Sequence, residues 1–411
     1  MLRIRGFALL WLALVLIALA EQMVAVAVGW QVYAIHHDPL DLGLIGLAEF
    51  VPLLVFALPA GHVADRLPRK LVFAASIVLS AAITALLLLV TTAGASLLWP
   101  FLVLAAAAGV ASALGTPAGR ALPPALVPAE LLAGAMALRS TGVQAAVVAG
   151  PAIGGLLFAL KPELVYVTAL VLLATGLVAT LALPRIVLVA EEATPRKLGG
   201  LRGVLAGISF IRRTPVLLGA IALDLFAVLF GGAVALLPVF ARDVLHTGPV
   251  GLGVLRSAPA AGAVVAGAFL THRPLRANVG RRLLVAVAGF GVSMIVFGLS
   301  RSFVLSLLAL AASGATDMVS MNIRSTTVAL ATPDGVRGRV NAVEMVFISA
   351  SNELGAFESG VAAALVGAAP AVVAGGVATV VIAVVWLRLF PPLARLDRFE
   401  DLAAERVAAA A

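Results

Sequence analysis

Three acidic residues lie inside long apolar stretches of the sequence, where ionisable side chains are rare. Glu21 is mid-way through the first such stretch, and Asp224 and Asp317 lie well inside two later ones. An acid within a membrane span is costly and by default indicates a functional site. Because burial favours the protonated form of a carboxylic acid, each could bind and release a proton. The alternative is a structural carboxylate paired with an arginine of a neighbouring helix, such as Arg139 or Arg256.

The composition shows whether these acids lie in a soluble protein or in a membrane protein. Of the 411 residues, 62% are hydrophobic and 12% are charged, and the mean hydropathy is +1.14. Soluble domains are roughly half apolar and about one quarter charged. The chain is therefore predicted to be an all-α membrane protein, which excludes a soluble enzyme, a coiled coil and a disordered chain. With no cysteine, disulfides, thiolate metal sites and cysteine nucleophiles are excluded as well.

Twelve apolar stretches are long enough to cross a bilayer, which takes about 20 residues of helix. Charged residues and clusters of proline and glycine set their limits. The expected spans are 6–35, 43–63, 70–92, 97–118, 131–159, 164–184, 215–241, 250–271, 283–300, 303–323, 340–366 and 370–390. The first span resembles a signal peptide at its start, but its apolar run is too long for one, and we expect it to be uncleaved.

The longest loop divides the spans six and six. We expect an N-terminal bundle over 1–184, a cytoplasmic linker over 185–214, a C-terminal bundle over 215–390 and a cytoplasmic tail over 391–411. Within the linker, Leu201–Ile211 is expected to form an amphipathic helix at the membrane surface.

The basic residues predict how the chain is oriented. With both termini in the cytoplasm, only four of the 28 lysines and arginines fall on the outer side, namely Lys161, Arg242, Arg256 and Arg301. This distribution follows the positive-inside rule, so the net charge of +8 indicates membrane orientation rather than nucleic-acid binding.

The two halves of the chain align with each other. A shift of 204 residues places Arg120 on Arg324 and Glu130 on Asp334, both in loops that follow the fourth span of their half. Two six-helix halves related by an axis along the membrane normal are a known transporter arrangement. The match also has a chance explanation, because alanine and leucine matches are common in this composition.

The loop after the second span combines a glycine, an acid and three cations: Gly61, Asp65, Arg66, Arg69 and Lys70. It resembles the G-x-x-x-D-R-x-G-R-[RK] loop of the major facilitator superfamily, with Pro68 in place of the second glycine. The resemblance implies a major facilitator fold of two pseudo-symmetric six-helix bundles. It also implies a cytoplasmic gate that these charges brace in one conformation. The alternative is an ordinary positive loop.

A second motif lies in the fifth span and contains Gly150, Pro151, Gly154 and Gly155. It resembles the core of the antiporter motif of facilitators that export drugs in exchange for protons. Simple packing in a helix rich in glycine and alanine is the alternative. Further stretches, among them Gly43–Pro59 and Thr332–Asn341, resemble the exporter branch of enterobactin-export and macrolide-efflux proteins.

The superfamily resemblance also implies that spans one, four, seven and ten line a central cavity. Glu21, Asp224 and Asp317 would then face one aqueous path as candidates for proton coupling. Possible substrate or gate contacts are Gln22, Arg120, Gln144, Asn322 and Arg324. Weaker acidic candidates are Glu49, Glu344, Glu353 and Glu358, of which Glu344 is expected to pair with Arg337 or Arg339.

These features predict a secondary active transporter of the bacterial inner membrane. The expected activity is export of lipophilic or amphipathic small molecules by proton antiport. The alternatives are proton-coupled transport of a specific metabolite such as a siderophore, and a membrane-embedded enzyme. The sequence has no hydrolase, zinc-protease or phosphate-loop signature, so no enzyme activity, cofactor or metal is expected. The expected partners are the substrate, protons and the lipid bilayer, without nucleic acid, and the chain is expected to be monomeric.

Overall fold

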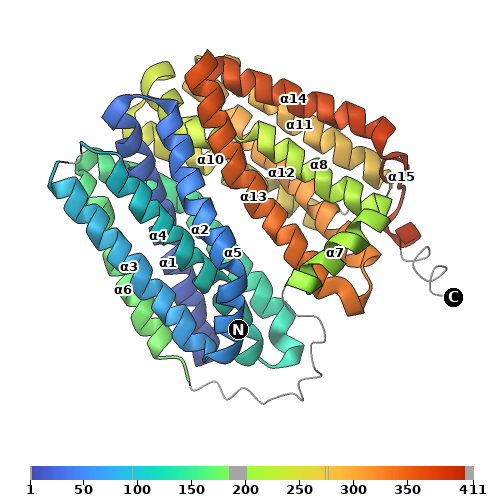
Figure 1. The fold of residues 1–411 in the computed structure, drawn as a ribbon, viewed down its shortest axis with the longest axis horizontal. Coiled ribbons are helices and arrows are strands. Elements are labelled where there is room, and N and C mark those ends of the chain that lie inside the picture. The colour runs from blue at the N-terminus through green and yellow to red at the C-terminus, as the bar shows by residue number, and fades with distance from the viewer. Residues whose placement is uncertain (1, 95, 185–200, 274, 276, 403–411) are drawn as a thin grey trace. The chain divides into compact units, whose positions relative to one another are not determined.

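The structure is a computed structural model that describes residues 2–94, 96–184, 201–273, 275 and 277–402. Inside helices, the side chains of 57–66, 129, 201–204 and 334 lie outside this description. The described part is almost entirely helical and contains no strand, as Figure 1 shows.

Eleven helical stretches among the described residues are long and apolar enough to cross a membrane. They are built on α1 (Arg5–His36), α2 (Pro39–Arg66), α3 (Arg69–Thr92), α4 (Trp99–Ala121), α5 (Ala129–Leu160), α6 (Pro162–Leu181), α8 (Pro215–Gly231), α10 (Gly248–His272), α11 (Val279–Leu299), α12 (Phe303–Ala331) and α14 (Ala368–Leu389). The twelfth is α13 (Asp334–Val366), which has 33 residues but carries more charge. The twelve expected spans are therefore confirmed.

The seventh span is not one regular helix. It breaks after Gly231 and Gly232 and continues as η2 (Ala233–Leu236), α9 (Leu237–Val239) and the π-helical η3 (Phe240–Val244). Segments of 3₁₀- and π-helix within a span are common at functional sites and hinges. The chain also passes from one compact unit of the fold to the other within this span, between Leu236 and Leu237.

Contacts group the described residues into two compact units. The first unit contains the residues up to 184 together with Leu237–Ser257, and the second contains 201 to Leu236 together with Ala258 to 402. The second part of the seventh span and the first part of the eighth, expected in the C-terminal bundle, thus group with the first six helices. The linker residues 185–200 lie outside the described residues, and α7 (Leu201–Arg213) is the short helix expected after them.

The first unit is joined by partly buried polar contacts as well as by apolar packing. In this unit α1 packs on α5 and α6, α2 on α4, and α3 on α4 and α6. Trp11 donates its indole N–H to the carbonyl of Leu138 at 3.0 Å, which links α1 to α5. Gln31 of α1 contacts both Tyr166 of α6 and Thr91 of α3, so three helices share one side chain.

The second unit repeats this pattern, because α8 packs on α13 and α14, and α11 packs on α12 and α14. The second and fourth helices of this unit, α10 and α12, touch where a Cβ at Gly314 would lie only 2.6 Å from Pro259 Cα. Trp386 of α14 donates its indole N–H to the carbonyl of Gly219 of α8 at 2.9 Å. The equivalent pairings support the internal repeat predicted from the sequence.

The expected C-terminal tail packs on the second unit over its described part. Leu393, Leu396 and Leu402 are buried in the core of this unit. The amides of Val279 and Gly280, at the start of α11, donate to the carbonyls of Asp397 and Leu396 at 3.1 and 2.9 Å. The backbone N–H of Asn278 donates to the Asp397 carboxylate at 2.7 Å. The tail therefore caps the start of α11.

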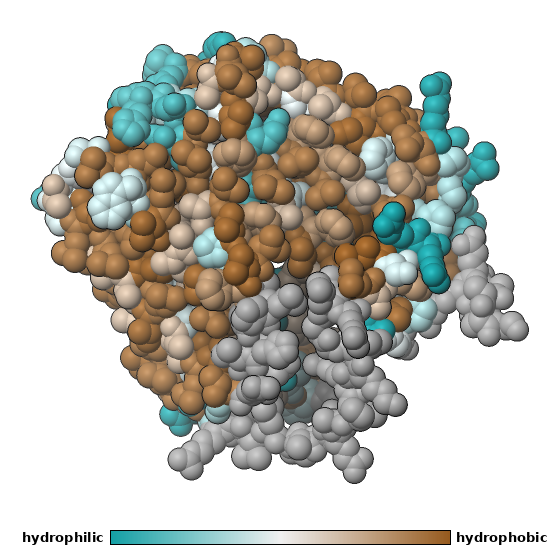
Figure 2. Space-filling view, in the orientation of Figure 1, coloured by the Kyte–Doolittle hydropathy of each residue, from teal (hydrophilic) through white to brown (hydrophobic). Residues whose placement is uncertain are grey.

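The outward-facing side chains are those of a membrane protein. Large apolar residues such as Val265, Val285 and Leu365 are at least 70% exposed. On the face drawn in Figure 2, hydrophobic side chains cover most of the described surface, and hydrophilic ones gather toward helix ends. An apolar surface of this extent needs lipid to cover it.

Candidate functional site

In the first unit, two acids and one cation from three helices form a connected set of charges. Glu21 lies in the middle of α1 with an exposed side chain. It interacts electrostatically with Glu49 of α2, which interacts in turn with Arg256 of α10. Glu49 is half-buried and close to α4, because a Cβ at Gly109 would lie 3.0 Å from the Glu49 carbonyl carbon. The position of Glu49 within this set of charges therefore depends on the packing of α2 against α4.

In the second unit, Arg324 lies between two acids from different helices. Its guanidinium forms an ion pair with Asp224 of α8, and its Nε lies 3.5 Å from Oε1 of Glu344 of α13. Asp224 and Arg324 are only 8% and 6% exposed. This triad ties together α8, α12 and α13, the first, fourth and fifth helices of the unit. Arg324, expected as a substrate or gate contact, thus contacts acids of its own unit.

Asp317 differs from Asp224, although both were expected to couple protons. Asp317 lies two turns before Arg324 on α12 and is exposed. In the described part of the chain, no cation lies within 4.0 Å of its carboxylate. The structure therefore separates the three acids of the sequence prediction into a buried, paired one and two exposed ones.

The gate motif lies at the junction of α2 and α3, and only part of it is described. Gly61, Asp65 and Arg66 fall in the last turns of α2, where the side chains lie outside the description. Lys70 donates from Nζ to the carbonyls of Leu181 and Leu183 at 2.8 and 2.6 Å. Cations at the C-terminal end of a helix satisfy its free carbonyls and complement its dipole. Lys70 thus caps α6.

Arg69 makes the corresponding contact with a second helix. Its guanidinium donates to the carbonyl of Ala121 at 3.4 Å, where α4 ends. The two described cations of the motif are therefore tied to backbone at the ends of α4 and α6. The expected role of the whole motif as a gate stays a prediction.

The glycines of the fifth-span motif bring α5 close to two helices. Gly150 lies against Gln22, and a Cβ at Gly154 would lie 2.9 Å from Met23 Cα, so this face packs on α1. Gly155 faces α10, where its Cβ would lie 3.1 Å from Gly253 Cα. Both interpretations of the motif require such close packing, and the contact with α10 explains why the start of α10 belongs to the first unit.

We expect Gly253→Ala to lower the stability of the protein by about 1–3 kcal/mol, the usual cost of overpacking a tight site. The new methyl group would lie 3.1 Å from the carbonyl carbon of Pro151, which is backbone and cannot move alone. Thermal unfolding in detergent measures the effect. Gly267→Ala is the matched control on the same helix, because its methyl group would meet only the flexible end of Met318, at 3.3 Å. Equal melting temperatures for the two variants would contradict the close contact.

A group of aromatic and charged side chains joins the end of α1 to η3 in the first unit. The Arg242 guanidinium lies 5.8 Å from the centre of the Trp30 ring, a cation–π distance. The Tyr33 hydroxyl is hydrogen-bonded to the Asp243 carboxylate. The sequence interpretation missed this group. The residue that could have indicated this group is Arg242, one of the four basic residues that the predicted topology places on the outer side of the membrane.

The remaining polar candidates lie on four different helices. Gln22, Gln144 and Asn322 are half-buried on α1, α5 and α12. Arg120 is exposed in the last turn of α4 and interacts electrostatically with Arg139 of α5. No group of three histidine or acidic side chains in the described residues could hold a metal ion.

A repeated pair of six-helix sets, with charged side chains inside the spans and an apolar outer surface, defines a membrane transporter of the major facilitator fold. The model of the transmembrane secretion effector family matches residues 1–408, and the chain belongs to this family.

Curated relatives include the enterobactin exporter EntS of Escherichia coli O81. It is 30% identical over 325 residues, which are 78% of this chain and 76% of the exporter. The exporter of Shigella boydii serotype 18 matches equally.

Solved structures share the fold. A bacterial homologue of the lysosomal transporter Spinster has a TM-score of 0.72 at 15% identity, with 95% of this chain and 96% of the other covered. A bacterial homologue of the iron transporter ferroportin has a TM-score of 0.70 at 17% identity, with 95% and 99% covered.

Proposed function

We propose that this protein exports an amphipathic or lipophilic organic molecule by alternating access, driven by protons moving in the opposite direction. It would act as a monomer in the plasma membrane of a bacterium, with both termini in the cytoplasm. The orientation is supported by the positions of the lysines and arginines in the sequence, which follow the positive-inside rule.

The observation that carries the proton coupling is the exposed Glu21 in the middle of α1, within electrostatic reach of Glu49. Two carboxylates that interact repel each other when both are ionised, so protonating either one removes the repulsion. Glu49 also interacts with Arg256. A proton on Glu21 would therefore change how strongly Glu49 attracts the helix α10. This gives the proton a means to alter helix packing.

The other two acidic candidates have different places in this proposal. Asp224 is buried against Arg324, and its negative charge is already compensated by the guanidinium. We assign it to holding the second unit together. Asp317 is exposed and has no cation beside it among the described residues, so it is the second choice as a proton carrier.

Alternating access requires parts of the chain to move relative to one another. The chain passes from one compact unit to the other inside its seventh and eighth spans, next to η2 and next to Pro259. Prolines and irregular helical turns are the usual places where helices bend. The gate motif at the end of α2 would restrain this movement through Asp65 and its basic neighbours.

A second candidate function is export of one specific metabolite such as a siderophore. It is favoured by the relatives at 30% identity, which are enterobactin exporters. Both candidates share the fold, the direction of transport and the proposed coupling, and they differ in the range of substrates.

Transport into proteoliposomes with an acidic interior tests the proposal. A proton–substrate antiporter should accumulate its substrate in the acidic compartment, because protons that leave drive the substrate in. The compounds to test are enterobactin and a panel of lipophilic cations, after a growth screen in a strain stripped of its own efflux pumps. Accumulation of many panel compounds supports the first candidate, and accumulation of enterobactin alone supports the second.

Two controls make this test decisive. Vesicles without protein measure passive partitioning, and nigericin dissipates the pH gradient without opening the vesicles. Protein-dependent accumulation that nigericin leaves unchanged would contradict proton coupling.

A further inference from the structure

An apolar cavity with one charged side chain lies in the second unit, between the surface helix α7 and the membrane helices α8 and α13. Its volume is about 260 Å³. Seven of its eight lining side chains are apolar, among them Ile208 of α7, Ile221 and Leu225 of α8, and Phe347 of α13. The eighth is Arg212, in the last turn of α7. None of the transport residues discussed above lines this cavity.

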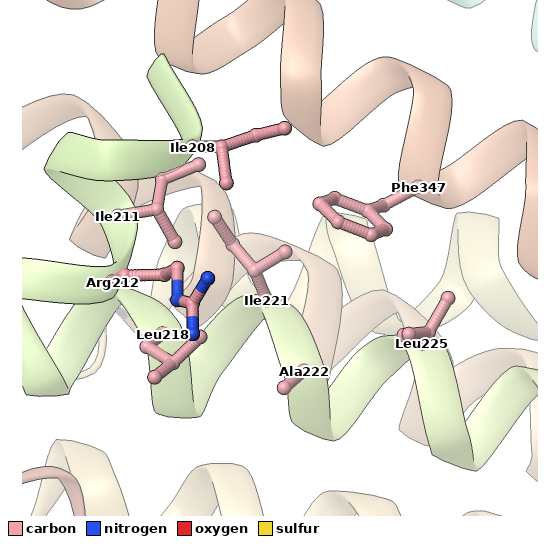
Figure 3. A pocket seen from close by; sticks show the side chains of 8 residues that line it. All are labelled: Ile208, Ile211, Arg212, Leu218, Ile221, Ala222, Leu225 and Phe347. Atoms are coloured by element: carbon pink, nitrogen blue, oxygen red, sulfur yellow. The ribbon is translucent and has the colours of Figure 1, made fainter. Parts of the chain in front are cut away.

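The charge lies toward one end of the cavity, whereas apolar side chains line its whole length. Figure 3 shows the guanidinium of Arg212 beside Leu218, whereas Phe347 and Leu225 lie at the far side. A ligand that fits this arrangement has an anionic group at one end and a hydrocarbon chain behind it. The volume is close to the lower limit of about 300 Å³ for pockets that bind small molecules, so it suits part of an acyl chain.

The helix α7 gives the cavity its place relative to the lipid. One side of α7 contributes Ile208 and Ile211 to the packing against α8 and α13, and Gly207 lies against the backbone of Arg339 of α13. Arg212 and Arg213 end the helix. Amphipathic helices with basic residues lie at the level of the lipid headgroups, where basic pockets between helices bind anionic headgroups.

We propose that this cavity binds one anionic phospholipid, with its phosphate on Arg212 and the first part of an acyl chain between Ile221 and Phe347. The lipid would hold α7 against α8 and α13. The proposal does not depend on which molecule the protein transports or on proton coupling.

Native mass spectrometry of the purified, delipidated full chain tests the site. The protein is titrated with phosphatidylglycerol or with phosphatidylcholine of the same acyl chains. One phosphatidylglycerol should be retained in preference to phosphatidylcholine. Arg212→Gln should weaken its retention about fivefold, as expected for one cation at an anionic membrane surface. Equal retention of the two lipids by the unchanged protein would overturn the proposal.

Two further variants separate the cavity from general surface charge. Arg213→Gln removes the same charge from the neighbouring residue, which is exposed as Arg212 is but does not line the cavity, and it should leave retention unchanged. Ala222→Phe keeps the charge but fills the cavity, and should abolish retention while the melting temperature shows that the protein is folded. Equal losses for Arg212→Gln and Arg213→Gln, or full retention in folded Ala222→Phe, would overturn the site. Should Ala222→Phe fail to fold, Leu225→Phe replaces it under the same criterion.

Discussion

Arg324→Gln should destabilise the protein by about 3–5 kcal/mol, because removing one partner of a buried ion pair leaves an uncompensated buried charge. Asp224 is only 8% exposed and pairs with one terminal nitrogen of the Arg324 guanidinium, while Glu344 lies beside its Nε. Without Arg324, two carboxylates from α8 and α13 would face each other with no cation between them. Thermal unfolding of the detergent-purified protein should show a large decrease in melting temperature.

The cause can be separated from a loss of packing. The variant that combines Arg324→Gln with Asp224→Asn and Glu344→Gln removes all three charges, and the two amides keep the shapes of the acids they replace. It should recover much of the lost stability, since neutral replacement of a buried ion network is often tolerated. Arg301→Gln, at an exposed arginine, should lie within about 0.5 kcal/mol of the unchanged protein. A single Arg324→Gln as stable as Arg301→Gln would contradict the role of the triad.

Glu21→Gln should abolish accumulation of substrate driven by a pH gradient, down to the level of vesicles without protein. Glutamine has nearly the shape of glutamic acid but cannot release a proton, so the change removes the proposed coupling and little else. Exchange of labelled for unlabelled substrate at equal pH should persist, because exchange needs no net proton movement. The measurement is uptake into proteoliposomes with and without the gradient.

The matched control for this variant is Glu163→Gln. Glu163 lies in the first turn of α6 and is outside the set of charges around Glu21. It should transport as the unchanged protein does. If gradient-driven uptake survives Glu21→Gln, the proton carrier is assigned to Asp317 instead. If it survives both Glu21→Gln and Asp317→Asn, proton coupling through these acids is excluded.

The number and order of spans could be predicted from the sequence because each span needs its own apolar run of about 20 residues. The ends were less accurate, and the reason is visible in α12. The sequence interpretation ended this span at residue 323, before the charge of Arg324, whereas the helix continues to Ala331. Arginine is a good helix former, so Arg324 does not end the helix. Asp224 and Glu344 compensate its charge inside the unit.

The candidate site was less predictable, because partners come from different helices. Glu21, Asp224, Asp317 and Arg324 were each recognised from their residue type and position. Nothing in the local sequence pairs Asp224 with Arg324, which is 100 positions later, or places Arg242 over Trp30. Arg139 and Arg256 were the examples given for the alternative in which one of these acids pairs with an arginine, and the arginine that pairs with Asp224 is Arg324. Such pairings depend on helix rotation, which span prediction leaves undetermined.

The capping of α11 by the tail affects how the C-terminal end of the protein can be altered. A polypeptide cut, or fused to a reporter, directly after α14 would lose the acceptors of three amides at the start of α11, together with the leucines beside them. A reporter fused at that point would therefore be attached to a protein whose second unit is destabilised. Attachment beyond Leu402 leaves these acceptors in place, and is therefore the position at which the side of the membrane should be assayed.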